Sequence, residues 1–225
     1  MCGRFAQYSS LPELKKRFAV ETVTCELTPS YNIVPLDFVP VVLYHGERRL
    51  GTLRWGLVPS WSKDTRRAAS LINARAETVA EKPSFRSAFR RRRCLVLTDG
   101  FFEWKKEGQQ KQPWYFTMAS GEPFAFAGLW ETWKDETGKA ADYHSCVIIT
   151  TEADRFMRDV HHRMPVILKP EMYSVWLDPN NREPDMLKEI LQAGKSGALQ
   201  GTRVSKHVNN PRNNDPSCIA SVPTG

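Results

Sequence analysis

The chain of 225 residues lacks the features that mark several large classes of protein. It has no internal repeat, no low-complexity segment and no apolar run near the roughly 20 residues that a membrane-spanning helix needs. Its first residues show no basic segment followed by an apolar stretch, so we expect no signal peptide and no membrane partner. We therefore expect a globular protein of the cytoplasm, associated with the nucleoid if the source is prokaryotic.

Cysteine is scarce and scattered. The sequence contains five cysteines, and no two of them form a C-x-x-C motif: Cys2, Cys25, Cys94, Cys146 and Cys218. An odd number at wide spacing is typical of free thiols in a reducing compartment and does not indicate a disulfide framework or a structural zinc site. We expect no metal ion and no cofactor.

The composition is that of a globular chain with an excess of positive charge. Hydrophobic residues make up 41% and aromatic residues 11%, which is enough for a sizeable core. The formal net charge is +7. This balance fits a polyanionic partner, most simply nucleic acid, although solubility alone would also explain it. The run Arg90–Arg93 adds little, because a charge run is usually a solvated surface.

Apolar runs and turn residues predict many strands and few helices. Strands are expected at residues 39–44, 49–55, 94–98, 114–118, 124–130, 144–150, 166–168 and 204–208. Helices are expected at residues 11–20, 170–176 and 185–193, and turns at Gly46, Gly108, Gly121 and Gly138. No linker divides the chain. The pattern therefore predicts one α+β domain over residues 1–225, with an irregular segment from Asn209 to Pro216.

The second residue is the most informative one. Removal of Met1 would leave Cys2 with a thiol and a free α-amine on adjacent carbons. The amine of such a residue condenses with an aldehyde to a Schiff base, and the thiol then closes a five-membered ring. Ordinary pKa values of about 7.7–8.0 for the amine and about 8.5 for the thiol leave both groups partly deprotonated near neutral pH. Taken alone, Cys2 favours the simpler interpretation, an accidental thiol that is buried or merely exposed.

Two segments place polar groups where a site would need them. Asn73, Arg75 and Glu77 alternate, so their side chains share one face if the segment is extended. That pattern favours either an ordinary amphipathic strand or a site in which Asn73 hydrogen-bonds a substrate and Arg75 binds a phosphate. Glu103 follows a buried strand among aromatic residues. Desolvation there would raise its pKa toward the range useful for proton transfer, and a surface Glu on an aromatic hairpin is the competing interpretation.

Histidine and tryptophan supply further candidates. His161 and His162 adjoin Arg163, and histidine is suited to proton transfer near neutral pH. Adjacent residues of a strand point to opposite faces, so we expect one histidine in a site and the other outside it. Trp55, in a predicted strand, should belong to the core. Trp61, in a loop with Pro and Ser, is the better candidate for stacking on an unpaired base.

These segments occur together and in order, and the chain resembles the SRAP family, the SOS-response-associated peptidases. The matching segments are residues 2–5, 31–35, 54–59, 71–77, 99–104, 160–165 and 204–209. Each segment alone is weak evidence, but the ordered set behind a cysteine at position 2 is specific and covers nearly the whole chain. One local departure is Val34, where alanine is familiar, and we expect no functional consequence from it.

The resemblance implies an SRAP-type fold, in which antiparallel strands form a barrel-like core with peripheral helices and the site lies in a basic cleft. It also implies a protein that senses abasic sites in single-stranded DNA. Once Met1 is removed, by self-processing or by an aminopeptidase, Cys2 would form a thiazolidine with C1′ of the ring-opened sugar. The covalent cross-link would shield the lesion during the DNA-damage response. An AP-lyase side activity is expected from the Schiff-base stage.

The resemblance also implies roles for single residues. Cys2 is the nucleophile, Asn73 contacts the captured sugar, Glu103 assists proton transfer near the α-amine, and His161 assists ring opening. A DNA-binding set is implied in which arginines bind phosphates and the other residues form apolar walls: Arg4, Pro35, Trp61, Arg75, Trp104 and Arg163. We expect the protein to act as a monomer.

Two other functions fit the same residue types. A cysteine peptidase acting on other proteins would use Cys2, His161 and Glu103. It predicts cleavage of a general substrate such as casein. A non-covalent reader of modified DNA bases predicts reversible, salt-sensitive binding that survives Cys2→Ala.

The position of Cys2 generates a first prediction. One residue inserted between Met1 and Cys2, and shown by intact mass to be retained, keeps the thiol but removes its neighbouring amine. We expect this variant to cross-link an abasic oligonucleotide as little as Cys2→Ala on a denaturing gel. Cross-linking at the level of the unaltered protein would contradict the role of the α-amine.

Overall fold

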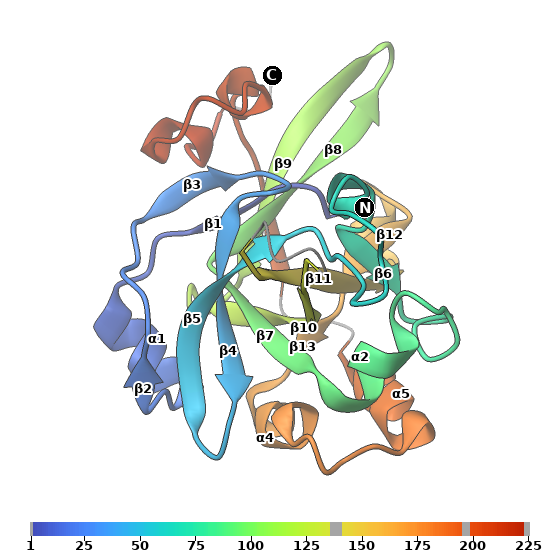
Figure 1. Ribbon diagram of the computed structural model, residues 1–225. Coiled ribbons are helices and arrows are strands. Elements are labelled where there is room, and N and C mark those ends of the chain that lie inside the picture. Colours follow the sequence, from blue (N-terminus) through green and yellow to red (C-terminus); the bar gives the residue numbers. More distant parts are fainter. Residues whose placement is uncertain (1, 136–140, 195–198, 223–225) are drawn as a thin grey trace.

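Five strands of the computed structural model close into a barrel (Figure 1). The structure describes residues 2–135, 141–194 and 199–222, so the predicted turn at Gly138 lies outside the described residues. The barrel strands are β4 (Phe38–Tyr44), β5 (Arg48–Trp55), β7 (Arg93–Thr98), β10 (Phe124–Trp133) and β11 (Tyr143–Glu152). They follow the order β11-β10-β7-β4-β5, and β5 pairs back onto β11. The predicted α+β fold with a barrel-like core is confirmed.

The pairing that closes the barrel is parallel. Ser145 lies opposite Arg54 and Cys146 opposite Trp55, whereas the other four barrel pairings are antiparallel. Parallel neighbours need a long crossover, and the chain between β5 and β11 provides one. Local sequence patterns predict strands but not their partners, so this closure is a property of the tertiary structure.

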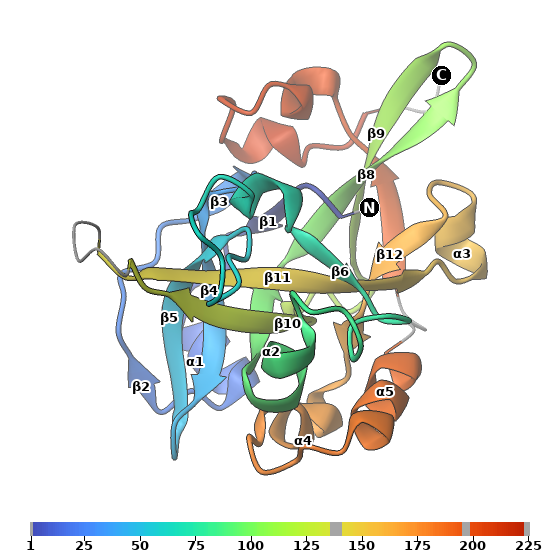
Figure 2. The ribbon, with the colours of Figure 1, turned by 45° about the vertical axis from the view of Figure 1, so that its right-hand side comes forward.

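A second sheet has the order β14-β9-β8-β1-β3. Its strands are β1 (Phe5–Gln7), β3 (Ser30–Ile33), β8 (Gly100–Glu107), β9 (Gln110–Met118) and β14 (Leu199–Arg203). Figure 2 shows the β8–β9 hairpin projecting away from the barrel. Barrel strand β7 passes into β8 through Asp99 alone, whose carboxylate accepts hydrogen bonds from the backbone N–H groups of Tyr8 and Ser9, at 2.5 and 2.8 Å. The first strand is thereby fixed to the corner between the two sheets.

Strand alternation divides the apolar residues into two clusters. On β7, Cys94 and Val96 belong to one cluster, while Leu95 and Leu97 belong to the other. The cluster that contains Leu95 and Leu97 packs against helices. Figure 1 shows α1, α4 and α5 covering the end of the barrel where this cluster lies. The cluster that contains Cys94 and Val96 also includes Cys2 and residues of the second sheet. The start of the chain is therefore part of the core.

The remaining elements are short and lie around the barrel. The strands are β2 (Thr22–Val23), β6 (Asn73–Arg75), β12 (Arg163–Pro165) and β13 (Ile167–Leu168). The helices are α1 (Leu11–Phe18), α2 (Arg86–Arg91), α3 (Arg155–Arg158), α4 (Tyr173–Leu177) and α5 (Pro184–Ala193). Four 3-10 turns complete the described part: η1 (Ala68–Ser70), η2 (Pro170–Met172), η3 (Lys206–Asn209) and η4 (Pro216–Cys218). No helix in this part of the chain is long and apolar enough to cross a membrane.

Most predicted elements are present, with two differences. The helix predicted over residues 11–20 begins at a capping box of Ser10 and Glu13 but ends at Phe18, because Ala19 adopts a left-handed conformation with φ 50°. The strand predicted over residues 204–208 is wrong. The side chain of Ser205 accepts a hydrogen bond from the His207 N–H, which begins the turn η3, and the strand lies just before it, in β14.

The arginine run does not form one solvated surface. Arg93 is buried and donates hydrogen bonds to the carbonyl oxygens of Trp176 and Asp178, among others. Burial lowers its pKa to about 10. Arg92 forms an ion pair with Glu131, and Arg90 and Arg91 are exposed. Arg92 and Arg93, half of the run, therefore bond to other parts of the protein.

The corner between the sheets generates a prediction about stability. A β-carbon at Gly100 would overlap the Tyr115 ring and lie 2.6 Å from the Phe116 carbonyl oxygen. We expect Gly100→Ala to lower the free energy of unfolding by about 1–3 kcal/mol, measured by urea denaturation. The matched control is Gly51→Ala, whose new methyl group meets Thr24 Oγ1 at 2.8 Å, an atom that can move by rotation of its side chain. Equal losses in the two variants would contradict this argument.

Candidate active site

Backbone pairing places Cys2 beside Glu103. Strand β1 is antiparallel to β8, with Phe5 opposite Phe101, and the Phe102 N–H donates to the Arg4 carbonyl. Continuing this register carries the residues before Phe5 toward Glu103. Cys2 and Glu103 are both buried, with exposed fractions of 0% and 4%.

The surroundings of Cys2 keep its thiol protonated. Burial raises the pKa of the Cys2 thiol far above its ordinary value, and the negative charge of Glu103 raises it further. A hydrogen bond from the Arg4 backbone N–H acts in the opposite direction but is the smaller effect. In this conformation the thiol becomes a nucleophile only if a neighbouring group takes its proton or a positive charge comes close.

Asn73 holds the backbone of Cys2. It lies on β6, which is parallel to β11 and has Asn73 opposite Ile148. Its side-chain N–H donates to the Cys2 carbonyl at 2.8 Å. The other amide atom, Asn73 Oδ1, is buried without a hydrogen-bond partner among the described residues. An unsatisfied buried acceptor is costly, so this oxygen is well placed to receive a donor from a bound molecule.

The two histidines lie in the loop between α3 and β12. Their rings stack with centroids 4.4 Å apart, because the loop does not impose the alternation of a strand. The two side chains therefore do not point to opposite faces, and the expectation that only one histidine belongs to the site stays a prediction. Nδ1 of His161 lies 3.0 Å from both the backbone N and the carbonyl oxygen of Arg163, so the Arg163 backbone holds the ring in either neutral tautomer.

His162 belongs to the same electrostatic environment as Glu103. The pKa of His162 is lowered, mainly by His161, while the charge of Glu103 opposes that shift. The stacking that brings His162 against His161 is a property of the folded loop, and the sequence pattern does not reveal it.

Arg4 and Trp104 connect the site to the end of the chain. The Arg4 guanidinium donates to Asn32 Oδ1 at 2.6 Å and to the Val208 carbonyl at 2.7 Å, and it lies 5.7 Å from the centre of the Trp104 ring. Burial lowers the pKa of Arg4. Trp104 Nε1 in turn donates to Asn209 Oδ1 at 2.8 Å.

The Arg163 side chain is held by hydrogen bonds within the protein. Its buried guanidinium forms two hydrogen bonds with the Glu77 carboxylate, at 2.8 and 3.0 Å, and a third with the Thr150 carbonyl at 2.7 Å. Burial alone would raise the pKa of Glu77, but the bonds from Arg163 lower it overall. Glu77 lies beyond the end of β6, so it does not share a face with Asn73 and Arg75. This geometry leaves Arg163 poorly placed for the phosphate contact expected of it.

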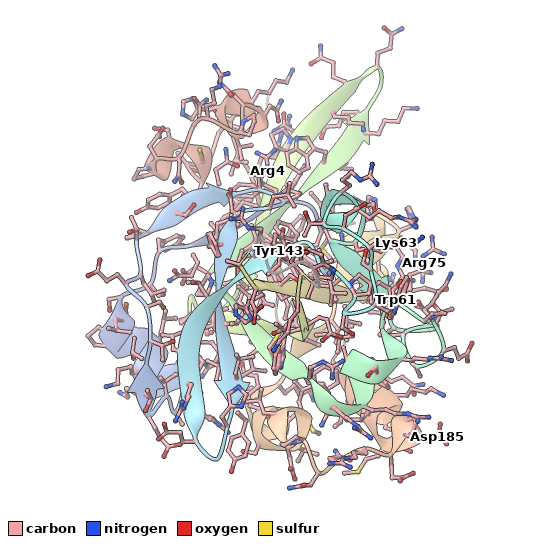
Figure 3. All side chains as sticks on the ribbon, in the orientation of Figure 1. Arg4, Trp61, Lys63, Arg75, Tyr143 and Asp185 are labelled. Carbon is pink, nitrogen blue, oxygen red and sulfur yellow. The ribbon has the colours of Figure 1, made fainter. Side chains whose placement is uncertain are left out.

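Three exposed side chains gather on one side of the molecule. Figure 3 shows Trp61, Lys63 and Arg75 close to the part of the ribbon that contains β6 and β12, whereas Arg4 lies toward β1. Trp61 is 65% exposed, as the loop position predicts, and Trp55 is buried. Lys63 was not identified from the sequence, because a single lysine in a polar loop has no distinctive pattern. Pro35 lies half-buried in the turn after β3.

Together, the fold and the site define a β-barrel protein with a candidate nucleophile at the start of its chain. A buried carboxylate and an asparagine lie beside that nucleophile, and a stacked pair of histidines includes His162, whose pKa the same carboxylate influences. The comparisons with known proteins agree with this class. The sequence model of the SOS response associated peptidase (SRAP) family matches residues 1–211, and the chain belongs to that family.

Curated relatives and solved structures cover nearly the whole chain. The abasic site processing protein YoqW of Bacillus subtilis is 41% identical, over 98% of this chain and 100% of the relative. The abasic site processing protein YedK of Escherichia coli is 30% identical, over 99% of this chain and 100% of the relative. A crystal structure of a Bacteroides thetaiotaomicron protein superposes with a TM-score of 0.87 at 25% identity, covering 98% of this chain and 100% of that one.

The ion pair of Arg163 generates the prediction for this site. Glu77→Ala leaves a buried guanidinium without its carboxylate, and we expect the free energy of unfolding to fall by about 1–3 kcal/mol. This range allows for solvent screening, because the Glu77 side chain is 44% exposed. The control is Asp185→Ala, which removes an exposed carboxylate paired with Lys188 and should leave stability unchanged within error. Equal effects in urea denaturation would contradict a structural role for Arg163.

Proposed function

We propose that this protein captures abasic sites in single-stranded DNA by forming a covalent thiazolidine through Cys2. The observation that carries the proposal is the position of Cys2 at the start of the chain, held by Asn73 and next to Glu103. A thiol used only as a side chain could lie anywhere in the fold. A thiol used together with an α-amine must lie at the N-terminus.

The names of the relatives support the same substrate. YoqW and YedK are described as abasic site processing proteins, as is the Xenopus tropicalis relative HMCES, which is 33% identical over 86% of this chain. An abasic sugar in its ring-opened form carries an aldehyde at C1′, the electrophile that an aminothiol traps. The formal charge of +7 suits a partner with a phosphate backbone.

The proposed reaction has three steps. Hydrolysis of the Met1–Cys2 peptide bond consumes one water and frees the α-amine of Cys2. The amine attacks C1′ of the aldehyde, and loss of one water gives an imine. The Cys2 sulfur then adds to the imine carbon, and the thiol proton ends on nitrogen, which closes the thiazolidine.

The neighbours of Cys2 supply the proton transfers. After Met1 is released, the new α-ammonium group would lie beside the thiol and lower the pKa that burial raises. Glu103 would accept a proton from that ammonium group, and His161 would transfer a proton to the sugar oxygen as the ring opens. Asn73 would fix the Cys2 carbonyl, and its unpaired Oδ1 would accept a hydrogen bond from a sugar hydroxyl.

The surroundings of the site would bind the DNA strand. Arg4 and Arg75 would contact phosphates, while Pro35, Trp61 and Trp104 would line the path of the bases, with Trp61 stacking on an exposed one. Arg163 would act indirectly, by holding the backbone and Nδ1 of His161. We propose that one protein molecule acts on each lesion, as a monomer in the cytoplasm.

The peptidase chemistry implied by the family name would be confined to Met1. Cleavage of other proteins by Cys2, His161 and Glu103 is the alternative, and the names of the relatives favour a DNA lesion as the substrate. An AP-lyase side reaction would arise if the imine eliminated the 3′ phosphate before the thiol closed the ring. Cys2→Ala, which keeps the amine and lacks the thiol, should therefore favour strand cleavage.

The proposal predicts graded losses of cross-linking. Cys2→Ala should form no heat-stable adduct with an abasic single-stranded oligonucleotide. Glu103→Gln should slow adduct formation about 10²–10⁴-fold, because proton transfer would lose its acceptor. Cys25→Ala is the matched control, since it removes a thiol far along the chain, and it should react normally. Denaturing gels and intact mass measure these rates.

Two outcomes would overturn the proposal. One is a heat-stable adduct of normal yield from Cys2→Ala. The other is a purified protein that retains Met1 and nevertheless reacts at full rate. Cleavage of casein that depends on Cys2 would favour the peptidase alternative, and salt-sensitive binding with no adduct would favour the non-covalent reader.

A further inference from the structure

We propose that the C-terminal segment contains a zinc site formed by His207, Asp215 and Cys218. One nitrogen, one oxygen and one sulfur atom from these residues all lie within 4.8 Å of one another. The segment comprises η3, η4 and the loop between them, and Figure 1 shows it beside β1 and β3. The sequence analysis expected no metal, because these residues follow none of the common C-x-x-C spacings.

The three donor atoms suit zinc in type and number. Zinc binds imidazole nitrogen, carboxylate oxygen and thiolate sulfur at about 2.0–2.3 Å, which in a tetrahedron puts donor atoms about 3.3–3.8 Å apart. Zinc binding would therefore require side-chain rotations that shorten the observed upper limit of 4.8 Å. His207 and Asp215 are partly exposed while Cys218 is buried, so the fourth position would face solvent and take a water molecule.

Other contacts already orient the donor groups. The Ser217 N–H donates to Asp215 Oδ1 at 2.9 Å, which leaves Oδ2 to face His207 Nε2, also at 2.9 Å. The Cys218 thiol donates to the Asn213 carbonyl at 3.5 Å. Zinc would replace the hydrogen bond between His207 and Asp215. Metal ligands are typically held in this way by surrounding hydrogen bonds.

Binding would move two protons. Zinc on Nε2 requires the neutral ring of His207 to carry its proton on Nδ1, 3.1 Å from Asn213 Nδ2, so the Asn213 amide would turn to present its oxygen and would give up the bond from Nδ2 to the His207 carbonyl. Burial raises the pKa of the Cys218 thiol, so the thiol keeps its proton until zinc displaces it and releases it to water. The product is a zinc–thiolate bond and one free proton.

The charge of the loaded site fits its neighbourhood. One zinc ion, one thiolate and one carboxylate sum to zero. The Arg4 guanidinium lies close enough to Cys218 for each to influence the pKa of the other. A zinc site with no net charge would not repel the Arg4 guanidinium. Zinc bound without the thiolate and the carboxylate would keep its positive charge and repel it.

Zinc would give this segment a cross-link that its secondary structure lacks. The side chain of Asn32 donates to the carbonyls of Val208, Asn210 and Asn213, and Arg4 also donates to Val208. A metal that joins His207 to Cys218 would hold these carbonyls in place. The inference stands without the proposed function, and its relevance to DNA binding, through Arg4, rests on that function.

Cobalt(II) absorption in the absence of DNA tests the site. The protein should carry Cys2→Ala, because a terminal aminothiol chelates metals itself. After removal of metals with a chelator, we expect one equivalent of Co²⁺ to give a thiolate charge-transfer band and the visible bands of tetrahedral cobalt, and Zn²⁺ to displace it. Cys218→Ser should abolish the charge-transfer band, and Cys25→Ser, the matched control, should keep it.

A second variant keeps the test decisive if Cys218→Ser does not fold. His207 is partly exposed, so His207→Gln should fold even if Cys218→Ser does not, and we expect it to weaken Co²⁺ binding at least about tenfold. Zn²⁺ should also raise the thermal midpoint of the unaltered protein more than that of His207→Gln. The absence of a thiolate band in the parent protein, or equal binding by His207→Gln, would overturn the proposal. Neither result bears on cross-linking by Cys2, which is measured with metal-free protein.

Discussion

The antiparallel pairing of β1 with β8 is the constraint on which the rest of the site depends. A chain terminus normally frays, because few contacts hold it. Here the first strand lies between β3 and β8, and Asp99 fixes the residues that follow it at the corner between the two sheets. This pairing carries Cys2 into the core and places it beside Glu103. A reactive residue at the end of a chain thus acquires the fixed geometry of a residue in the middle of one.

The same burial that fixes Cys2 also suppresses its reactivity. A desolvated thiol next to a carboxylate stays protonated, and a protonated thiol is a weaker nucleophile than a thiolate. Release of Met1 would change the charge next to the Cys2 thiol and would leave the charges elsewhere in the protein unchanged. The geometry is therefore suited to a protein whose reactive group is formed by one cleavage and then meets its neighbours already in place.

The sequence predicted the five barrel strands, the core position of Trp55 and the exposure of Trp61, but it did not predict β1 or β8. It also singled out Cys2, Asn73, Glu103 and His161 as candidate site residues, largely because an ordered set of motifs resembles one family, and their roles stay predictions. It did not predict the stacking of His162 on His161, the burial of Arg163 against Glu77, or the buried position of Arg93. Each of these depends on a partner far away along the chain, and local periodicity contains no information about such partners.

The sequence by itself determined which groups exist and in what order: a cysteine after the first residue, alternating strands, an excess of arginine and lysine, and the motif residues between them. Tertiary structure alone decided which of those groups meet. The barrel closes through a parallel pair, β6 brings Asn73 to the Cys2 carbonyl, and the C-terminal segment brings His207, Asp215 and Cys218 together beside Arg4. The physical reason is that hydrogen bonds and charges act over a few ångströms in space, whereas these residues are separated by up to two hundred positions in the chain.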